Sequence, residues 1–174
     1  MAELSRHRDW IFDFVTMVAV LIGLTFGAIE LRQMRNAQEA QAALELFQTI
    51  QTEGYTRGTG LIFQLPDTIS PEALRAMSST AEGELMFQVR LTYEALGVMV
   101  YRGEVSIDWV DELFRFMILD SWDKFEEFTL EERERLGYPE AMEWHQWLAE
   151  RLRERERIGD APAYEAYRDW KPDA

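Results

Sequence analysis

The sequence predicts an all-α protein in which an N-terminal transmembrane helix continues into an antiparallel helical bundle. Residues 10–29 form a run of twenty mostly apolar residues whose one charged member is Asp13. Every later long segment repeats its apolar residues at three- and four-residue steps, and none shows the alternation of a strand. Short connections join these segments, which is typical of antiparallel helical neighbours.

The apolar run at residues 10–29 has the length of a membrane span. A helix rises about 1.5 Å per residue, so twenty residues cover roughly 30 Å, the thickness of the hydrocarbon core. A signal peptide is the first alternative, but the start is mixed in charge and only Gly27-Ala28 offers a cleavage site. A buried helix of a soluble protein is the second, and the length and flanks of the run disfavour it. We therefore expect a retained anchor.

Residues at the two ends of the span are candidates for the membrane interface. Arg6 and Arg8 precede the span and Arg32 and Arg35 follow it, so the positive-inside count is nearly tied. The arginine-bearing continuation and the absence of cysteine favour a cytoplasmic C-terminal domain at a cell membrane. The interface candidates are Trp10, Asp13, Arg32 and Arg35. Asp13 lies one turn from Trp10, so its carboxylate can reach headgroup water, although an intramembrane acid is also a functional candidate.

The charge of the chain limits its partners. Acidic residues outnumber basic ones 32 to 18, which gives a net charge of −14. Nucleic acid binding needs a basic face, so we expect no nucleic-acid partner. The same balance argues against the domain lying flat on anionic lipid. The residues after the span suffice for one domain with a hydrophobic core.

The first half of the predicted bundle follows from helix start and stop signals. No Gly or Pro interrupts residues 30–52, so the first helix is expected to continue to about Thr52. Gly54, Gly58 and Gly60 then weaken the helix. Ser70 followed by proline and glutamate begins a short helix that ends near Met77. Residues 81–101 form the next helix, closed by a glycine at position 103, with inward apolar positions at Leu85, Met86, Val89, Tyr93, Leu96 and Val100.

The second half contains two more helices. Ser106 begins a helix to residue 128, and the expected inward residues are Ile107, Val110, Leu113, Phe114, Met117, Ile118 and Trp122. Thr129 and Glu132 have the spacing of a capping box, which predicts a new helix start. Gly137-Tyr138-Pro139 separates a last long helix at residues 140–158. The predicted organisation is a tail at 1–9, the span at 10–29, a bundle domain at 30–159 and a short amphipathic tail at 160–174. The bundle helices would be the second half of the first helix and residues 81–101, 106–128 and 140–158.

The sequence resembles a family of small uncharacterised bacterial membrane proteins, and two groups of residues carry the resemblance. The first group ends the span and begins an Ala- and Gln-rich helix at 37–43: Leu21, Leu24, Ala28, Ile29, Leu31, Arg32 and Gln33. The second is the turn at 101–105 before Trp109. The resemblance covers most of the chain and implies a single-span anchor at the bacterial inner membrane with a helical domain. It implies no activity.

We expect neither a metal nor a cofactor, and we assign no catalytic residue. A di-metal carboxylate bundle needs Glu-x-x-His pairs, but Leu4 and Met142 precede the two histidines, His7 and His145, by three residues. His145 is expected to be an interfacial or partly buried side chain. The acids at 120, 123, 126 and 127 are typical of a solvated helix face and lack the spacing of a calcium loop. We therefore expect no enzyme and identify no small-molecule substrate.

Two features favour contacts with other proteins. Gly23 and Gly27 have the Gly-x-x-x-Gly spacing that lets two membrane helices approach closely. Tyr164, Tyr167 and Trp170 lie on a tail too short to bury them by itself, so they could dock on the bundle or on a partner.

The sequence hypothesis is a non-enzymatic single-pass membrane protein that acts as an accessory, stabilising or scaffolding subunit of a larger membrane assembly. Its partners would be the lipid bilayer and other membrane proteins, or further copies of itself. The alternative is a membrane-tethered sensor or regulator whose helical domain is the input or output module.

Overall fold

The computed structural model describes residues 17, 20–34, 37, 41, 48, 50–155 and 163–171. The chain divides into two compact units, Met1–Leu46 and Phe47–Ala174, and each is described by itself. All regular secondary structure in the described residues is helical, without a strand. The predicted all-α class is therefore confirmed.

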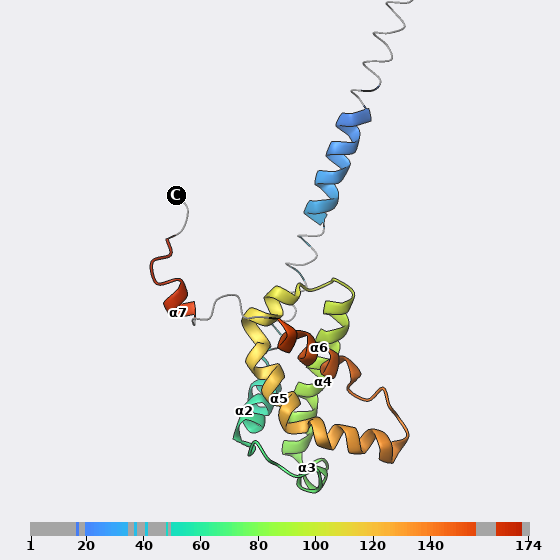
Figure 1. The fold of residues 1–174 in the computed structure, drawn as a ribbon, viewed down its shortest axis with the longest axis vertical. Helices are drawn as coiled ribbons and strands as arrows, with labels where there is room; N and C mark the ends of the chain where they lie inside the picture. The colour runs from blue at the N-terminus through green and yellow to red at the C-terminus, as the bar shows by residue number, and fades with distance from the viewer. Residues whose placement is uncertain are drawn as a thin grey trace, which may run out of the picture. The chain divides into compact units, whose positions relative to one another are not determined.

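In the first unit, residues 20–34 form a helix, drawn in blue in Figure 1. Thr25 Oγ1 donates to the Leu21 carbonyl at 2.8 Å, the bond from a helical threonine to the preceding turn. In the described part of the chain, no helix combines the length and the apolarity that a membrane crossing requires. Residues 10–16, 18 and 19 of the predicted span lie outside the described residues, so the span itself stays a prediction.

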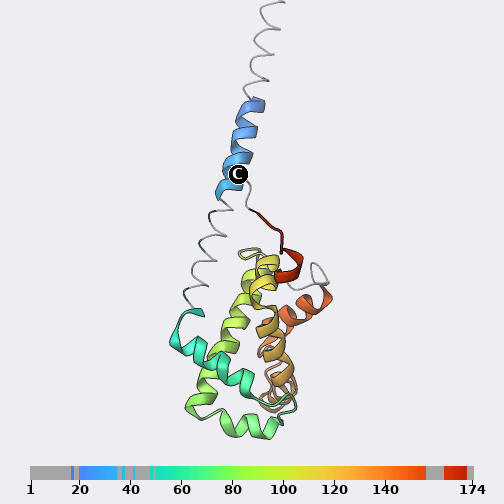
Figure 2. The ribbon, with the colours of Figure 1, turned by 90° about the vertical axis from the view of Figure 1, so that its left-hand side faces the viewer.

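The second unit is built from six helices within the described residues: α2 Glu53–Gln64, α3 Pro71–Met77, α4 Ala81–Tyr101, α5 Ile107–Leu136, α6 Glu143–Glu154 and α7 Ala163–Ala166. Helices α2 and α6 both pack on α4, while α5 packs on α6 and α3. Figure 2 shows α2 crossing in front of the yellow-green α4. The core is apolar and fully enclosed where these helices meet, at Ile62, Met86, Val89, Tyr93, Leu96, Val110, Ile118, Trp122, Leu148 and Leu152.

Side-chain caps fix the starts of these helices. The hydroxyls of Ser70, Thr80 and Ser106 each accept a hydrogen bond from a backbone N–H of the first turn. Gly103 and Gly137 have positive φ angles of 71° and 65° just beyond the ends of α4 and α5. The predicted boundaries at these positions are confirmed, because each follows from local hydrogen bonding.

Helix α2 belongs to the bundle, although the predicted bundle helices did not include it. About half of the predicted segment 30–52 lies outside the described residues, so its place in the bundle stays a prediction. The segment with the glycines is helical from Glu53 to Gln64, where the sequence predicted a weakened helix. Gly58 shows the reason, since a Cβ there would lie 2.5 Å from the Leu85 carbonyl oxygen. The glycine allows α2 to approach the backbone of α4, and this contact outweighs its poor helix propensity.

Helix α5 is longer than predicted and continues through Thr129. The Thr129 hydroxyl donates to the Phe125 carbonyl at 2.7 Å, one turn back, rather than capping a new helix. The buried residues of α5 are Val110, Phe114, Ile118, Ser121, Trp122, Lys124, Phe125 and Thr129. Leu113 is 49% exposed, so its predicted inward position was also wrong.

Helix α6 is shorter than the predicted 140–158. It begins at Glu143 and ends at Glu154. Met142 adopts a left-handed conformation with φ 56°, which breaks the helical path after Pro139. Gly97 of α4 allows the start of α6 to lie close, since a Cβ there would be 2.4 Å from the Trp144 carbonyl oxygen.

Candidate functional site

The structure leaves the predicted helix-packing residues open. An added Cβ at Gly23 or at Gly27 would meet no atom within 4 Å. Leu24 and Phe26 are exposed to 67% and 68%, and Arg32 is exposed. Trp10, Asp13 and Arg35 lie outside the described residues. The predicted protein-docking residues Tyr164, Tyr167 and Trp170 are likewise exposed, and among described residues α7 packs against no other helix.

A cavity of about 630 Å³ lies among α3, α4, α5 and the turn before α6. Sequence analysis did not predict it. Most of its lining is apolar, contributed by Leu74, Met77, Met86, Phe87, Leu91, Phe125, Phe128, Leu136, Ala141 and Met142. Its volume is within the range of small-molecule sites, roughly 300–1,000 Å³. A second hollow of about 730 Å³ beside α5 has a larger share of charged side chains in its lining, so the apolar cavity is the better candidate for a small-molecule site.

Arg90 of α4 lines this cavity and is only 3% exposed. Its Nη2 donates to Thr129 Oγ1 at 2.5 Å, while its Nε has no partner. The guanidinium carbon lies 4.5 Å from the centre of the Phe125 ring, in cation–π geometry. Burial lowers the pKa of Arg90 to about 9, with Glu94 opposing and Arg133 adding to that shift. The side chain remains a cation at neutral pH.

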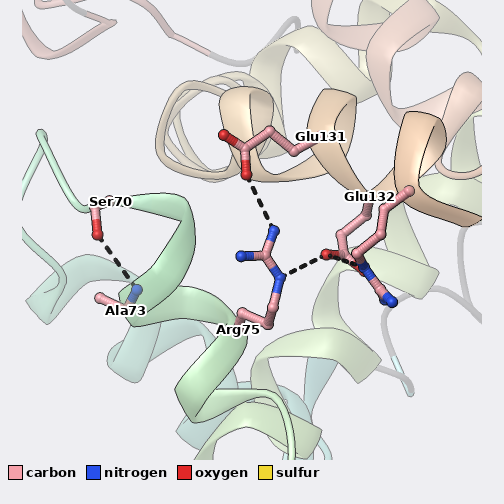
Figure 3. Close-up of polar contacts among 6 residues, drawn as sticks. Ser70, Ala73, Arg75, Glu131 and Glu132 are labelled. Atoms are coloured by element: carbon pink, nitrogen blue, oxygen red, sulfur yellow. Dashed lines mark hydrogen bonds and ion pairs between the residues drawn. The ribbon is translucent and has the colours of Figure 1, made fainter.

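Charged side chains surround the mouth of the cavity. Arg75 of α3 donates from Nε to Glu132 at 2.8 Å and from Nη2 to Glu131 at 3.0 Å, which ties α3 to α5 (Figure 3). Glu132 also accepts from Arg135. Hydrogen bonds from Arg135 and then Arg75 lower the pKa of Glu132 to about 2. The two arginines at the mouth are thus already paired.

Glu94 connects the cavity wall to α6. Its carboxylate accepts the backbone N–H of His145 at 2.7 Å. Met142, the residue at the N-cap position of α6, makes no side-chain cap bond. A carboxylate from α4 therefore satisfies a free N–H in the first turn of α6, at the positive end of the helix dipole.

His145 is fully buried, contrary to the expected interfacial or partly exposed position. Its ring lies 5.3 Å from that of Tyr93 and 5.4 Å from that of Trp122. Nε2 lies 3.3 Å from the Ile118 carbonyl, which can only accept, so this nitrogen carries the proton. Burial, and secondarily the charge of Arg90, lowers the pKa of His145 to about 3. The imidazole is neutral, and no cluster of three or more metal-ligating side chains occurs in the described residues.

Sequence reasoning missed Arg90 and Glu94, although one signal was present. Arg90 is four residues after Met86 and three before Tyr93, on the apolar stripe of its helix. A charged residue on a buried stripe indicates a specific partner or a ligand, since unpaired buried charge is costly. Glu94, by contrast, is identifiable only from the tertiary position of α6.

The fold and site define an all-helical domain with an apolar cavity over a buried arginine. The chain belongs to the family described as a domain of unknown function (DUF4760), whose model matches residues 17–152. The resemblance to an uncharacterised family is therefore confirmed. Neither the curated proteins nor the solved structures contain a match to this chain.

Proposed function

We propose that this chain is a non-enzymatic, single-pass membrane protein whose helical domain is an accessory, stabilising or scaffolding subunit of a larger membrane assembly. One observation carries the proposal: the helix at 20–34 exposes its apolar side chains on all sides. Leu21, Ile22, Leu24 and Phe26 are each more than half exposed. A helix that is apolar all round is stable only when lipid or protein covers it.

Membrane attachment is the first part to test. Residues 10–29 would span the bilayer, with the C-terminal domain in the cytoplasm of a bacterial cell. Carbonate-washed membranes should retain the full-length chain, and a reporter active only outside the inner membrane, fused after Ala174, should stay silent. Release of the chain by carbonate, or an N-terminus beginning after Ala28, would contradict the anchor. A strong reporter signal would reverse the orientation alone.

The subunit role is the second part. Purification in mild detergent should yield either a stoichiometric membrane-protein partner or a defined homo-oligomer. The exposed aromatic residues Tyr164, Tyr167 and Trp170 support such contacts, because aromatic side chains are frequent anchors of interfaces. A free monomer at every protein concentration and in several detergents would contradict this role.

A membrane-tethered sensor is the second candidate, and the cavity over Arg90 favours it. The cavity wall includes Glu94, whose carboxylate caps α6. Ligand entry could therefore alter the start of α6. A chain that has no stable partner, and whose α6 amides change their hydrogen-exchange rates when a ligand is added, would support the sensor role over the subunit role.

A further inference from the structure

We propose that the cavity among α3, α4 and α5 binds an amphiphile with one carboxylate head and an apolar body, and that the carboxylate pairs with Arg90. The inference goes beyond the subunit role, because the cavity lies within the second unit, Phe47–Ala174; only the nanodisc format of its test rests on the proposed anchor. It assigns the chemical class of a ligand from the lining of one cavity.

The apolar body is indicated by the cavity wall. Side chains from three helices face this space, among them Leu74 of α3, Met86 and Leu91 of α4, and Phe128 of α5. Methionine side chains adapt their shape to a ligand at little cost. A hydrocarbon body that covers this wall would remove it from water, the main favourable contribution to apolar binding.

The carboxylate head is indicated by the incomplete hydrogen bonding of Arg90. Within the described residues its guanidinium makes one hydrogen bond, to Thr129, and Nε is unpartnered. A buried cation lacking acceptors is unfavourable. The guanidinium matches a carboxylate in shape and can donate two parallel hydrogen bonds to it. A carboxylate in the cavity supplies the acceptors that the protein itself does not.

The remaining charges limit the head to a single negative charge. Arg75 and Arg135 are both engaged by Glu132, whereas the acids Glu84, Glu94 and Glu140 also line the cavity. A phosphate ester or other multiply charged anion would meet these carboxylates with only Arg90 to balance it. A cationic head would meet Arg90 at the buried end of the cavity. A monocarboxylate is the anion that this arrangement accommodates.

A head-group series tests the inference on the full chain in lipid nanodiscs, where no free detergent competes. Decanoate, decanol and decyltrimethylammonium share one tail and differ in charge. Titration calorimetry, with empty nanodiscs as the blank, should give decanoate at least about tenfold tighter binding than decanol. Equal binding of decanoate and decanol, or tightest binding of the ammonium compound, would overturn the proposal.

Variants locate the head group. Arg90→Met should lower decanoate affinity to that of decanol, while Arg102→Met, at an arginine exposed outside the cavity, should leave it unchanged. Leu91→Trp should weaken all three probes at least fivefold by filling the mouth, since Leu91 is 45% exposed there. Leu91→Trp leaves Arg90 intact, so it still tests whether the ligand binds in this cavity if Arg90→Met does not fold. Undiminished decanoate binding in folded Arg90→Met or in Leu91→Trp would place the ligand elsewhere.

Discussion

Three polar side chains of the bundle, Arg90, Glu94 and Lys124, take hydrogen-bond partners from other helices. Lys124 of α5 donates to the Ile62 carbonyl of α2 at 3.2 Å and to Asp120 at 3.0 Å. Glu94 of α4 accepts from the backbone of α6, and Arg90 of α4 donates to Thr129 of α5. Each of these bonds satisfies a group that burial would otherwise leave without water. Single substitutions at such positions should therefore affect the packing of whole helices.

Removing the carboxylate of Glu94 should destabilise α6. Glu94→Ala leaves the His145 N–H without its acceptor and should lower the free energy of unfolding by about 1–2 kcal/mol. Glu94→Gln keeps an acceptor oxygen but loses the charge at the helix N-terminus, so its loss should be smaller. Thermal unfolding and amide exchange of α6 measure both. Equal stability of the alanine variant and the parent would show that the cap is dispensable.

Because His145 is buried and neutral, the free energy of unfolding should decrease as the pH is lowered. Its pKa is about 3 in the folded state and about 6.5 in the unfolded state, so between these pH values the unfolded chain binds this proton and the folded chain does not. Stability is fully present above pH 6.5 and is lost as the pH falls from 6.5 toward 3. Between pH 7 and pH 5 the loss should be about 2 kcal/mol. Chemical unfolding of the full chain, in one detergent throughout, measures this slope.

His145→Gln provides the control for this slope. The variant retains a polar side chain opposite the Ile118 carbonyl but has no titrating ring. It should be less stable than the parent at pH 7 and nearly independent of pH between 7 and 5. Because His7 and all carboxyl groups are unchanged, parallel slopes for parent and variant would rule out His145 as the titrating group.

Substitutions at two glycines of α2 distinguish the effect of helix packing on stability from the effect of helix propensity. Gly58→Ala places a Cβ against the backbone of α4 and should destabilise the domain by about 1–3 kcal/mol. Gly60 has open space at the same position, so Gly60→Ala should stabilise it by about 0.5–1 kcal/mol through helix propensity alone. Thermal unfolding of the two variants, side by side, checks the opposite signs. A stabilising Gly58→Ala would mean that α2 and α4 are further apart.

Element boundaries with local causes could be predicted from the sequence, and those with tertiary causes could not. The starts at Ser70 and Ser106 depend on a hydroxyl bonding the next turn, which sequence spacing shows directly. Thr129 has the same spacing to Glu132, yet its hydroxyl bonds Phe125 and accepts from Arg90 of another helix. The capping-box spacing therefore predicted a helix start that does not exist, because the contact with Arg90 of α4 stabilises a continuous α5.

At the scale of the whole molecule, the helix at 20–34 should associate through its glycine face. Gly23→Leu combined with Gly27→Leu would fill that face while keeping the segment apolar, so insertion should persist and close helix contact should be lost. Cross-linking in membranes and sedimentation in detergent should then show a lower association state. Leu21→Ile with Ile29→Leu, on the opposite face of the helix, serves as the control. An unchanged state in the glycine variant would exclude this contact.

By itself the sequence determined the all-α class and the helix boundaries at Ser70, Met77, Gly103 and Ser106, because caps and periodicity act over a few residues. Its resemblance to an uncharacterised family was also visible without the structure. Only the tertiary structure decided which helices form the bundle, where Gly58 and Gly97 allow close approach, and that Arg90 lies beneath an apolar cavity. Those features depend on which faces of distant segments meet. Burial then changes the same side chain from a solvated cation into an incompletely paired one, and no local pattern records that environment.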